Sequence, residues 1–278
     1  IQHRSSYGLG EVIKAALDNH TEHLVISLGG IGSFDGGAGM LQALGARFYD
    51  DEAQIVDMRK GADLIKYIRR IDLSGVHPQL AKVNIQLMSD FSSRLYGKKS
   101  EIMQTYESLE LSQIEAAEID NLIWYFSELF KNELKIAMGP IERGGAGGGI
   151  AAVLNSLYQA EILTSHELVN QITHLENLIQ QADLIIFGEG LKEEDQILET
   201  TTIRIAELTQ QYNKPAIAIC ATNDKFDLFE SLNVTAMFNT FIDMPDSYTD
   251  FKMGIQIRHY TVQALKLLKT QINLPLSS

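Results

Sequence analysis

Residues 23–39 read HLVISLGGIGSFDGGAG, an apolar run that passes directly into a glycine-rich loop. The run at 23–28 predicts a buried strand. Glycine lets backbone N–H groups face a ligand without interference from a Cβ atom, and a short helix expected over 37–45 would add the positive partial charge of its N-terminus. The stretch therefore predicts a strand, an anion-binding loop and a helix in succession, which is a building unit of α/β folds.

Two further glycine-rich stretches follow the same logic. Residues 144–149 read GGAGGG and open a helical pattern that begins at Ile150. Residues 188–190 read GEG and follow the apolar run 184–187. Three such loops in one chain predict a site for a polyphosphate or a carboxylate.

The composition narrows the class of protein. The chain has 278 residues and a net charge of −13, which argues against non-specific binding to nucleic acid. No apolar run approaches the ~20 residues needed to cross a bilayer, so no membrane partner is expected. Cys220 is the single cysteine and predicts a reducing, cytoplasmic location. Because the sequence begins with Ile1 and not Met, we expect that an upstream segment was removed or left out.

Apolar periodicity predicts further elements before residue 180. The pattern at 111–134 predicts a long amphipathic helix that begins with a capping box of Ser112 and Glu115. Helices are also expected over 9–19 and 60–70, a half-buried strand over 83–88 and a turn over 160–167. The expected core face of the long helix consists of Ile114, Ile119, Leu122, Ile123, Phe126, Leu129 and Phe130.

The final part of the chain alternates between short apolar runs and helical patterns. This alternation predicts a parallel sheet with helical crossovers. The expected strands are 184–187, 216–220 and 235–238, and the expected helices are 200–211, 225–231 and 253–272. Three strands make a thin parallel sheet, so we expect a second copy of the chain or another segment to cover an exposed apolar edge or face.

These elements predict an α/β fold of two α/β domains with a boundary near Gln180. Residues 1–180 would form a glycine-rich α/β domain. Residues 181–278 would form a Rossmann-like half domain with a partial parallel sheet.

Three acidic residues lie where a strand or a glycine turn ends. Asp90 follows the strand expected over 83–88, a position suited to ligand contact, although an N-cap fits the local sequence equally well. Asp35 lies inside the first glycine loop, where a turn-forming or capping role is the simplest interpretation. Glu189 lies between two glycines and has room to face a ligand or a Mg²⁺ ion.

A dinucleotide-binding site is an alternative interpretation of the first loop. Residues 30–35 read GIGSFD, so the third glycine of a G-x-G-x-x-G pattern arrives one position late. Asp50 and Asp51 lie at roughly the distance downstream that ribose binding needs. The sequence contains no G-x-x-x-x-G-K-[ST] motif, which excludes a P-loop nucleotide-binding site of that type.

The chain resembles the ATP-dependent, non-P-loop glycerate kinases over almost its whole length. Residues 35–45 are the most specific part of this resemblance. It is carried by residues 6–11 (SYGLGE), 29–30 with 35–45 (GG and DGGAGMLQALG), Asp90, 145–149 (GAGGG) and 182–190 (ADLIIFGEG).

The resemblance implies a fold, an activity and a set of site residues. It implies two α/β domains, ATP and Mg²⁺ as cofactors, and phosphorylation of D-glycerate or a similar small hydroxy acid. It also implies a family N-terminal segment, absent here, that would complete the thin sheet. The implied catalytic residues are Asp90, Asp35, Glu189 and Glu193, with Glu189 on Mg²⁺. The implied substrate- and phosphate-binding residues are Gly29, Gly30, Ser33, Gly36, Gly37, Gly147, Gly148, Gly188 and Gly190.

The sequence also departs from the family pattern. Residues 188–193 read GEGLKE where the family has Gly-Glu-Gly-Arg, an aliphatic residue and Asp, so Glu193 replaces that Asp with a longer arm. Two basic residues are lost between this motif and the next, and the cations that could compensate are Lys98, Lys99, Arg143 and Lys192. A catalytically impaired relative that binds an organic acid or a nucleotide is therefore a second hypothesis.

Overall fold

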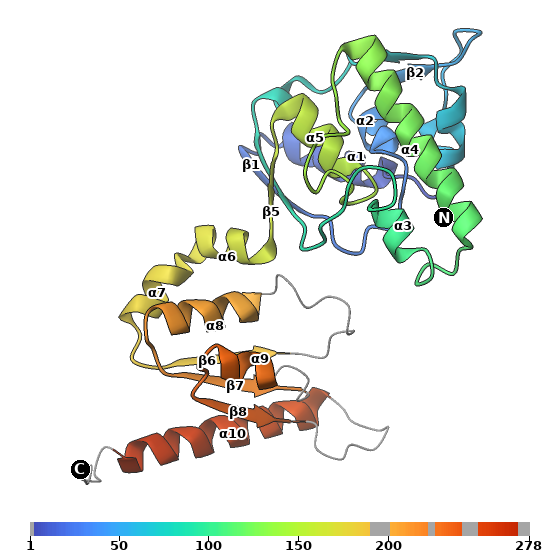
Figure 1. The fold of residues 1–278 in the computed structure, drawn as a ribbon. Helices are drawn as coiled ribbons and strands as arrows, with labels where there is room; N and C mark the ends of the chain where they lie inside the picture. Colours follow the sequence, from blue (N-terminus) through green and yellow to red (C-terminus); the bar gives the residue numbers. More distant parts are fainter. Residues whose placement is uncertain (1–2, 190–200, 222–225, 241–249, 272–278) are drawn as a thin grey trace. The chain divides into compact units, whose positions relative to one another are not determined.

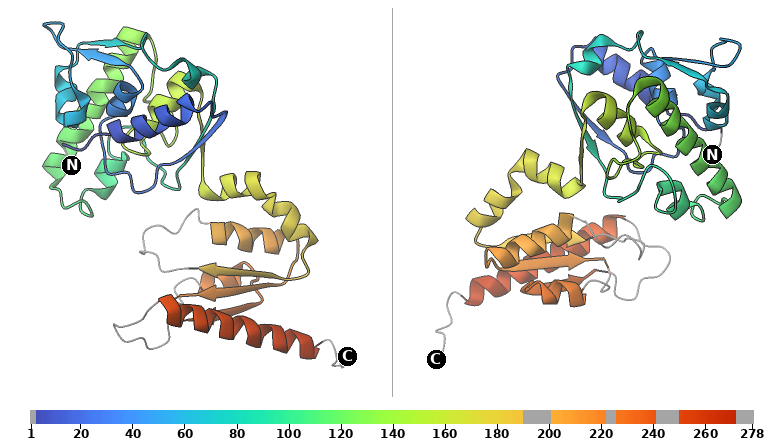
Figure 2. Two further views of the ribbon diagram at one scale, coloured as in Figure 1. Left: turned by 180° about the vertical axis from the view of Figure 1, so that it is seen from behind. Right: turned by 45° about the horizontal axis from the view of Figure 1, so that its top comes forward.

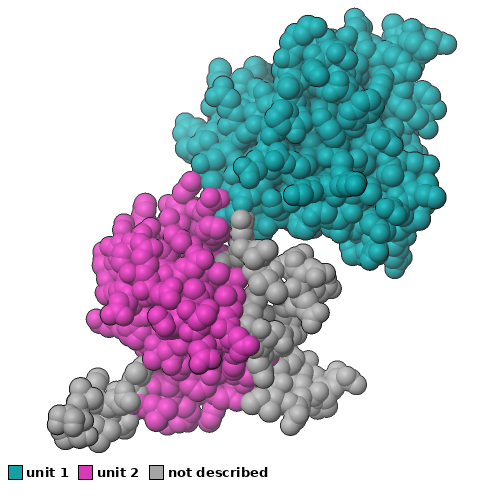
Figure 3. Space-filling view, in the orientation of Figure 1, with its two compact units in different colours: residues 1–164 teal, residues 165–278 magenta. Residues whose placement is uncertain are grey.

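The computed structural model describes residues 3–189, 201–221, 226–240 and 250–271. The chain forms two compact units, which are residues 1–164 and residues 165–278 (Figure 3). The division therefore falls earlier than the boundary predicted near Gln180. Helices α6 (Ser165–Thr173) and α7 (Leu175–Gln181) pack against α8 (Thr201–Gln211), which places them in unit 2.

Unit 1 contains a parallel sheet of three strands. Strands β1 (His23–Ser27), β4 (Asn84–Met88) and β5 (Glu161–Leu163) pair in the order β1-β4-β5 (Figure 1). The strands predicted over 23–28 and 83–88 are confirmed, but the turn predicted over 160–167 is wrong because it contains β5 and the start of α6. Strand β5 has only three residues, and its pairing with β4 decides its conformation where local sequence does not.

Five helices of unit 1 surround this sheet and its connections. They are α1 (Tyr7–Asp18), α2 (Ala38–Ala43), α3 (Glu101–Thr105), α4 (Gln113–Leu134) and α5 (Ile150–Tyr158). The helices predicted over 9–19, 37–45 and 111–134, and the one predicted to begin at Ile150, are confirmed. Helix α2 begins directly after the first glycine-rich loop and α5 directly after the second.

Helix α4 supplies much of the core of unit 1. Its capping box of Ser112 and Glu115 is present as predicted. Most of the predicted core face is buried or partly buried in the main apolar cluster, including Phe126 and Phe130, whose rings contact each other edge-on. Ile114 is an exception at 74% exposed.

Residues 58–72 differ from the single helix predicted over 60–70. They form two 3₁₀ helices, η1 (Met58–Lys60) and η2 (Ala62–Tyr67), followed by strand β3 (Arg70–Asp72). Strand β3 pairs antiparallel with β2 (Arg47–Tyr49), and both strands are too short for a clear alternation in the sequence. Gly61 between the two 3₁₀ helices has a φ of +111°, which interrupts the helical conformation.

Unit 2 contains the parallel sheet predicted for the final part of the chain. Strands β6 (Ile185–Glu189), β7 (Ala216–Cys220) and β8 (Ala236–Asn239) pair in that order. Helices α8 and α9 (Phe226–Ser231) cover one face of the sheet, and α10 (Asp250–Gln271) covers the other (Figure 2). The α/β fold class is thus confirmed. No helix within the described ranges combines the length and apolar character that a membrane span requires.

Candidate functional site

Asp35 is the polar centre of the junction between α1 and the first glycine loop. Its side chain is 0% exposed, and its Oδ2 accepts hydrogen bonds from the backbone N–H and the hydroxyl of Ser6, both at 2.9 Å. The Gly39 N–H donates to Oδ2 and the Gly37 N–H donates to Oδ1, both at 3.1 Å. This carboxyl group therefore ties the chain before α1 to the loop before α2.

Burial and hydrogen bonding act on Asp35 in opposite directions. Burial raises the pKa of the Asp35 carboxyl above its ordinary value, while the hydrogen bonds from Ser6, Gly39 and Gly37 oppose that rise. A side chain so fully enclosed holds the local backbone in place. The contacts agree with the turn and capping interpretation, and the catalytic role of Asp35 stays a prediction.

The two glycine-rich loops of unit 1 pack directly against each other. The Gly36 N–H donates to the Gly148 carbonyl at 3.0 Å, and a Cβ atom on Gly148 would collide with the Ser33 carbonyl. Gly148 also has a φ of +63°, a conformation that favours glycine. The turns near Gly36 and Gly147 thus lie side by side, whereas Gly188 belongs to unit 2.

A carboxyl group accepts hydrogen bonds from backbone N–H groups of the second glycine loop. Glu101 in α3 accepts a hydrogen bond through Oε2 from the Gly148 N–H at 3.2 Å, and the Gly147 N–H contributes another. Burial raises the pKa of Glu101 to about 7, against the lowering effect of these two hydrogen bonds. The amides of Gly36 and Gly37 also have partners within the chain. The phosphate-binding role predicted for Gly147 and Gly148 therefore requires Glu101 to move. For Gly36 and Gly37 the same role requires their amides to leave the Gly148 carbonyl and the Asp35 carboxyl, and both roles stay predictions.

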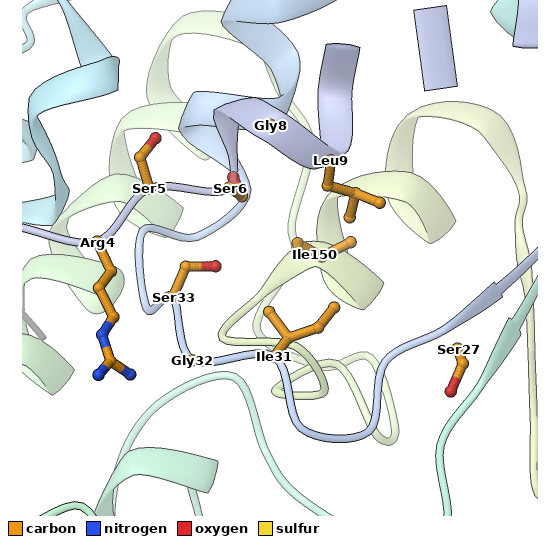
Figure 4. A pocket seen from close by; sticks show the side chains of 10 residues that line it. All are labelled: Arg4, Ser5, Ser6, Gly8, Leu9, Ser27, Ile31, Gly32, Ser33 and Ile150. Carbon is orange, nitrogen blue, oxygen red and sulfur yellow. The ribbon is translucent and has the colours of Figure 1, made fainter. Parts of the chain in front are cut away.

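An open cavity of about 540 Å³ lies beside the first glycine loop. Its wall comes from the start of α1, the end of β1, residues 31–33 and Ile150 at the start of α5 (Figure 4). Ser33, which the sequence assigned to substrate or phosphate binding, is part of this wall. Gly29 and Gly30 are exposed on the same loop just before it.

Of the described residues that line the cavity, Arg4 is the one cation, and sequence analysis did not identify it. The basic residues expected to compensate for the lost family cations were Lys98, Lys99, Arg143 and Lys192. The first three do not line the cavity, and Lys192 lies outside the described residues. Arg4 lies two residues before the motif at 6–11, and no sequence pattern singled it out.

Asp90 lies at the same sheet edge as the cavity. It is exposed and follows β4, whose last residue Met88 pairs with Ser27 at the end of β1. Ser27 lines the cavity. The carboxyl ends of parallel strands are the usual place for ligand contacts, so this position is compatible with the role predicted for Asp90.

Unit 2 holds the remaining predicted site residues. Gly188 and Glu189 end β6. Glu189 is 8% exposed, and its carboxyl accepts a hydrogen bond from the Thr202 hydroxyl. Gly190 and Glu193 lie outside the described residues. Where the chain is described, no group of three His, Cys, Asp or Glu side chains is arranged to hold a metal ion. A single carboxylate suits Mg²⁺ only in company with phosphate oxygens and water.

Comparison with known proteins gives a consistent family. The model of the glycerate kinase family matches residues 1–256. The glycerate kinase of Halalkalibacterium halodurans is 32% identical over 78% of this chain and 57% of its own length, and that of Haemophilus influenzae is 30% identical over 91% and 66%. A crystal structure from Salmonella typhimurium LT2, assigned as glycerate kinase 2, shares 28% identity with a TM-score of 0.79, covering 98% of this chain and 71% of that one.

The chain belongs to the glycerate kinase family. The family match extends over both units described above. The fold and the family expected from the glycine-rich segments are therefore confirmed. The chain spans little more than half the length of the first of these glycerate kinases, at 57%.

Membership of the glycerate kinase family gives the glycine-rich segments a common context. Two of them meet in unit 1 beside the cavity, together with the start of α1. Sequence reasoning identified Ser33 in this region but missed Arg4 and Glu101. Glu101 gave no signal, because a glutamate after Ser100 reads as an ordinary residue of a helix first turn.

Proposed function

We propose that this protein catalyses ATP-dependent phosphorylation of D-glycerate or a similar small hydroxy acid. The observation that carries the proposal is the meeting of three family segments around one cavity in unit 1. These segments are the start of α1, the first glycine loop and the start of α5. Phosphoryl transfer depends mainly on positioning and charge neutralisation, which such a constellation of amides and a cation can supply.

The acidic residues take different parts in this proposal. Asp90 would accept the proton of the acceptor hydroxyl, since it is exposed at the carboxyl end of β4. Asp35 would hold the loop that forms the cavity, as its hydrogen bonds indicate. Glu189 in unit 2 would help to hold Mg²⁺ with ATP, and Gly188, Gly190 and Glu193 belong to the same motif. The bound Mg²⁺ would neutralise phosphate charge.

A catalytically inactive relative that binds an organic acid or a nucleotide is the second candidate. The observation in its favour is the contact between Glu101 and the Gly148 N–H, because a resident carboxyl group there competes with an incoming phosphate.

We also propose a cytoplasmic location, from the single buried thiol of Cys220. A second copy or another segment would cover the edge strand β6, where Ile186 is 39% exposed.

ADP release in a coupled assay across a panel of small hydroxy acids tests the proposal. We expect turnover with D-glycerate and a loss of about 100-fold or more in Asp90→Asn, the range typical of a removed general base. Glu118→Gln on the outer face of α4 serves as a control for the loss of a surface carboxylate. Binding of glycerate or ATP without ADP release would favour the inactive relative, and unchanged turnover in Asp90→Asn would remove Asp90 from the mechanism.

A further inference from the structure

Ser33 is a buried residue whose hydroxyl has no hydrogen-bond partner among the described residues. The residue is 6% exposed, and Figure 4 shows its hydroxyl directed into the cavity, between the first turn of α1 and Ile150. A hydroxyl that faces a cavity without a protein partner takes its hydrogen bonds from a ligand or from water. The Ser33 hydroxyl therefore marks a position where a polar ligand atom is expected.

The first turn of α1 presents two more donors to the same cavity. The hydroxyl of Ser6, the N-cap residue, donates to Asp35 and accepts from the Met40 N–H, so it does not cap its own helix. The Tyr7 N–H donates to the Ser5 hydroxyl. For the amides of Gly8 and Leu9, the described part of the chain offers no acceptor, and both residues line the cavity. An unsatisfied helix N-terminus of this kind attracts negative charge.

Arg4 completes the set of donors. Its guanidinium lies over Gly32, so close that a Cβ atom on Gly32 would be 2.5 Å from Nη1. Arg4 is exposed and, within the described residues, has no ion-pair partner. Among the described residues, no Asp or Glu side chain lines the cavity, although the chain as a whole carries a net charge of −13. The electrostatic potential inside the cavity therefore favours an anion, although the net negative charge of the whole molecule repels one.

The rest of the wall distinguishes a small organic acid from a bare phosphate ion. Leu9, Ile31 and Ile150 line the cavity beside these donors, and Figure 4 shows the two isoleucines facing its interior. Apolar side chains suit the carbon atoms of a short acid and do not compensate the hydration lost by phosphate. A planar guanidinium also matches both oxygens of a carboxylate.

We propose that Arg4, the Ser33 hydroxyl and the amides of Gly8 and Leu9 form a subsite for the carboxylate of a small hydroxy acid. The inference rests on the proposed function for the choice of a hydroxy acid. The subsite would anchor the charged end of the acceptor and leave its hydroxyl groups free to turn toward the carboxyl ends of β1 and β4.

Isothermal titration of the full-length protein with D-glycerate tests this subsite without any need for turnover. Arg4→Gln removes the cation, and Ser33→Ala removes the unpartnered hydroxyl. Charge-assisted hydrogen bonds of this kind predict that each variant weakens binding about 10-fold or more. The matched controls are Arg47→Gln, an exposed arginine on β2, and Ser127→Ala, a buried serine on α4; neither lines the cavity.

Two further titrations identify the ligand group that is bound. The methyl ester of D-glycerate keeps the hydroxyl groups but lacks the charge, and we expect it to bind at least about 10-fold more weakly. Inorganic phosphate supplies an oxyanion without a carbon chain. Equal affinity for the ester, binding of phosphate alone, or no binding of D-glycerate would each overturn the proposal.

The outcome separates this inference from the proposed function. Binding that depends on Arg4 and Ser33 without ADP release would keep the subsite and reject the kinase. ADP release whose KM for D-glycerate is unchanged in both variants would keep the kinase and reject the subsite. Near-ultraviolet circular dichroism of each variant checks that the fold is retained.

Discussion

At the scale of single residues, Asp35 carries a buried carboxyl group that holds the backbone, whereas the carboxyl group of Asp90 is exposed. Asp35→Asn would replace one carboxylate oxygen with an NH₂ group, which cannot accept a hydrogen bond. In one orientation of the amide this group would face the donors of Ser6 and Gly39, and in the other it would face the Gly37 N–H. We expect it to lower the free energy of unfolding by about 2–3 kcal/mol, whereas Asp90→Asn should change it by less than about 0.5 kcal/mol. Denaturant titration followed by the fluorescence of Trp124, the single tryptophan, reports on unit 1. Equal stability of the two variants would contradict the structural role of Asp35.

Glu101 makes the stability of unit 1 depend on pH. Because its pKa rises from 4.5 to about 7 in the folded protein, its contribution to stability is greatest below about pH 4.5 and is lost as the pH rises through 7. One pKa unit corresponds to about 1.4 kcal/mol, so after an allowance for partial exposure the loss is about 2–3 kcal/mol. The Glu101→Gln variant has no carboxyl group to ionise at this position. As the pH rises from 5 to 8, its free energy of unfolding should therefore increase relative to that of wild type by that amount.

The measurement for Glu101 is the same fluorescence-detected unfolding at several pH values. Glu118→Gln, which removes an exposed carboxylate from α4, is the control and should follow the wild-type profile. Parallel profiles for wild type and Glu101→Gln would show that the buried carboxyl does not titrate as described.

Single residues differ in how far the sequence could predict them. Ser33 was implied as a binding residue by the resemblance of its glycine loop to the family, and it lines the cavity. Arg4 and Glu101 were missed because distant contacts give them their positions. Arg4 lies against Gly32, and Glu101 accepts a hydrogen bond from Gly148; each glycine is far from its partner in sequence. A local pattern records which residue types adjoin a loop but not which side chain arrives from elsewhere.

At the scale of elements, the packing of the two glycine loops is the decisive contact of unit 1. Gly148→Ala would force a Cβ atom against the Ser33 carbonyl at a φ of +63°. We expect a loss of about 3 kcal/mol or more, since neither backbone has room to yield. Gly29→Ala is a matched control, because a Cβ atom there meets nothing within 4 Å. Thermal unfolding of both variants checks this, and a Gly148→Ala variant as stable as Gly29→Ala would refute the close packing.

Long elements with strong periodicity were predictable, and short ones were not. Helix α4 was found with its capping box because 22 residues of pattern and a Ser-x-x-Glu start agree. Strands β2, β3 and β5 have three residues each, too few for alternation to show. Their conformation comes from pairing with partners that local sequence does not reveal.

At the scale of the whole molecule, strand–helix alternation predicted the parallel sheet of unit 2, and the glycine-rich segments predicted the family. The division of the chain was less accessible, because α6 and α7 look like continuations of unit 1 but pack with α8. Each unit has its own apolar core, formed in unit 1 by one large cluster and in unit 2 by a cluster on each face of its sheet.

We propose that this member of the glycerate kinase family transfers a phosphoryl group to a small hydroxy acid. The most direct measurement is phosphorus-31 NMR of the full-length protein with ATP, Mg²⁺ and D-glycerate. We predict a growing phosphomonoester signal that accompanies the conversion of ATP to ADP and depends on D-glycerate. ATP that remains intact, while Trp124 fluorescence shows unit 1 to be folded, would contradict the claim.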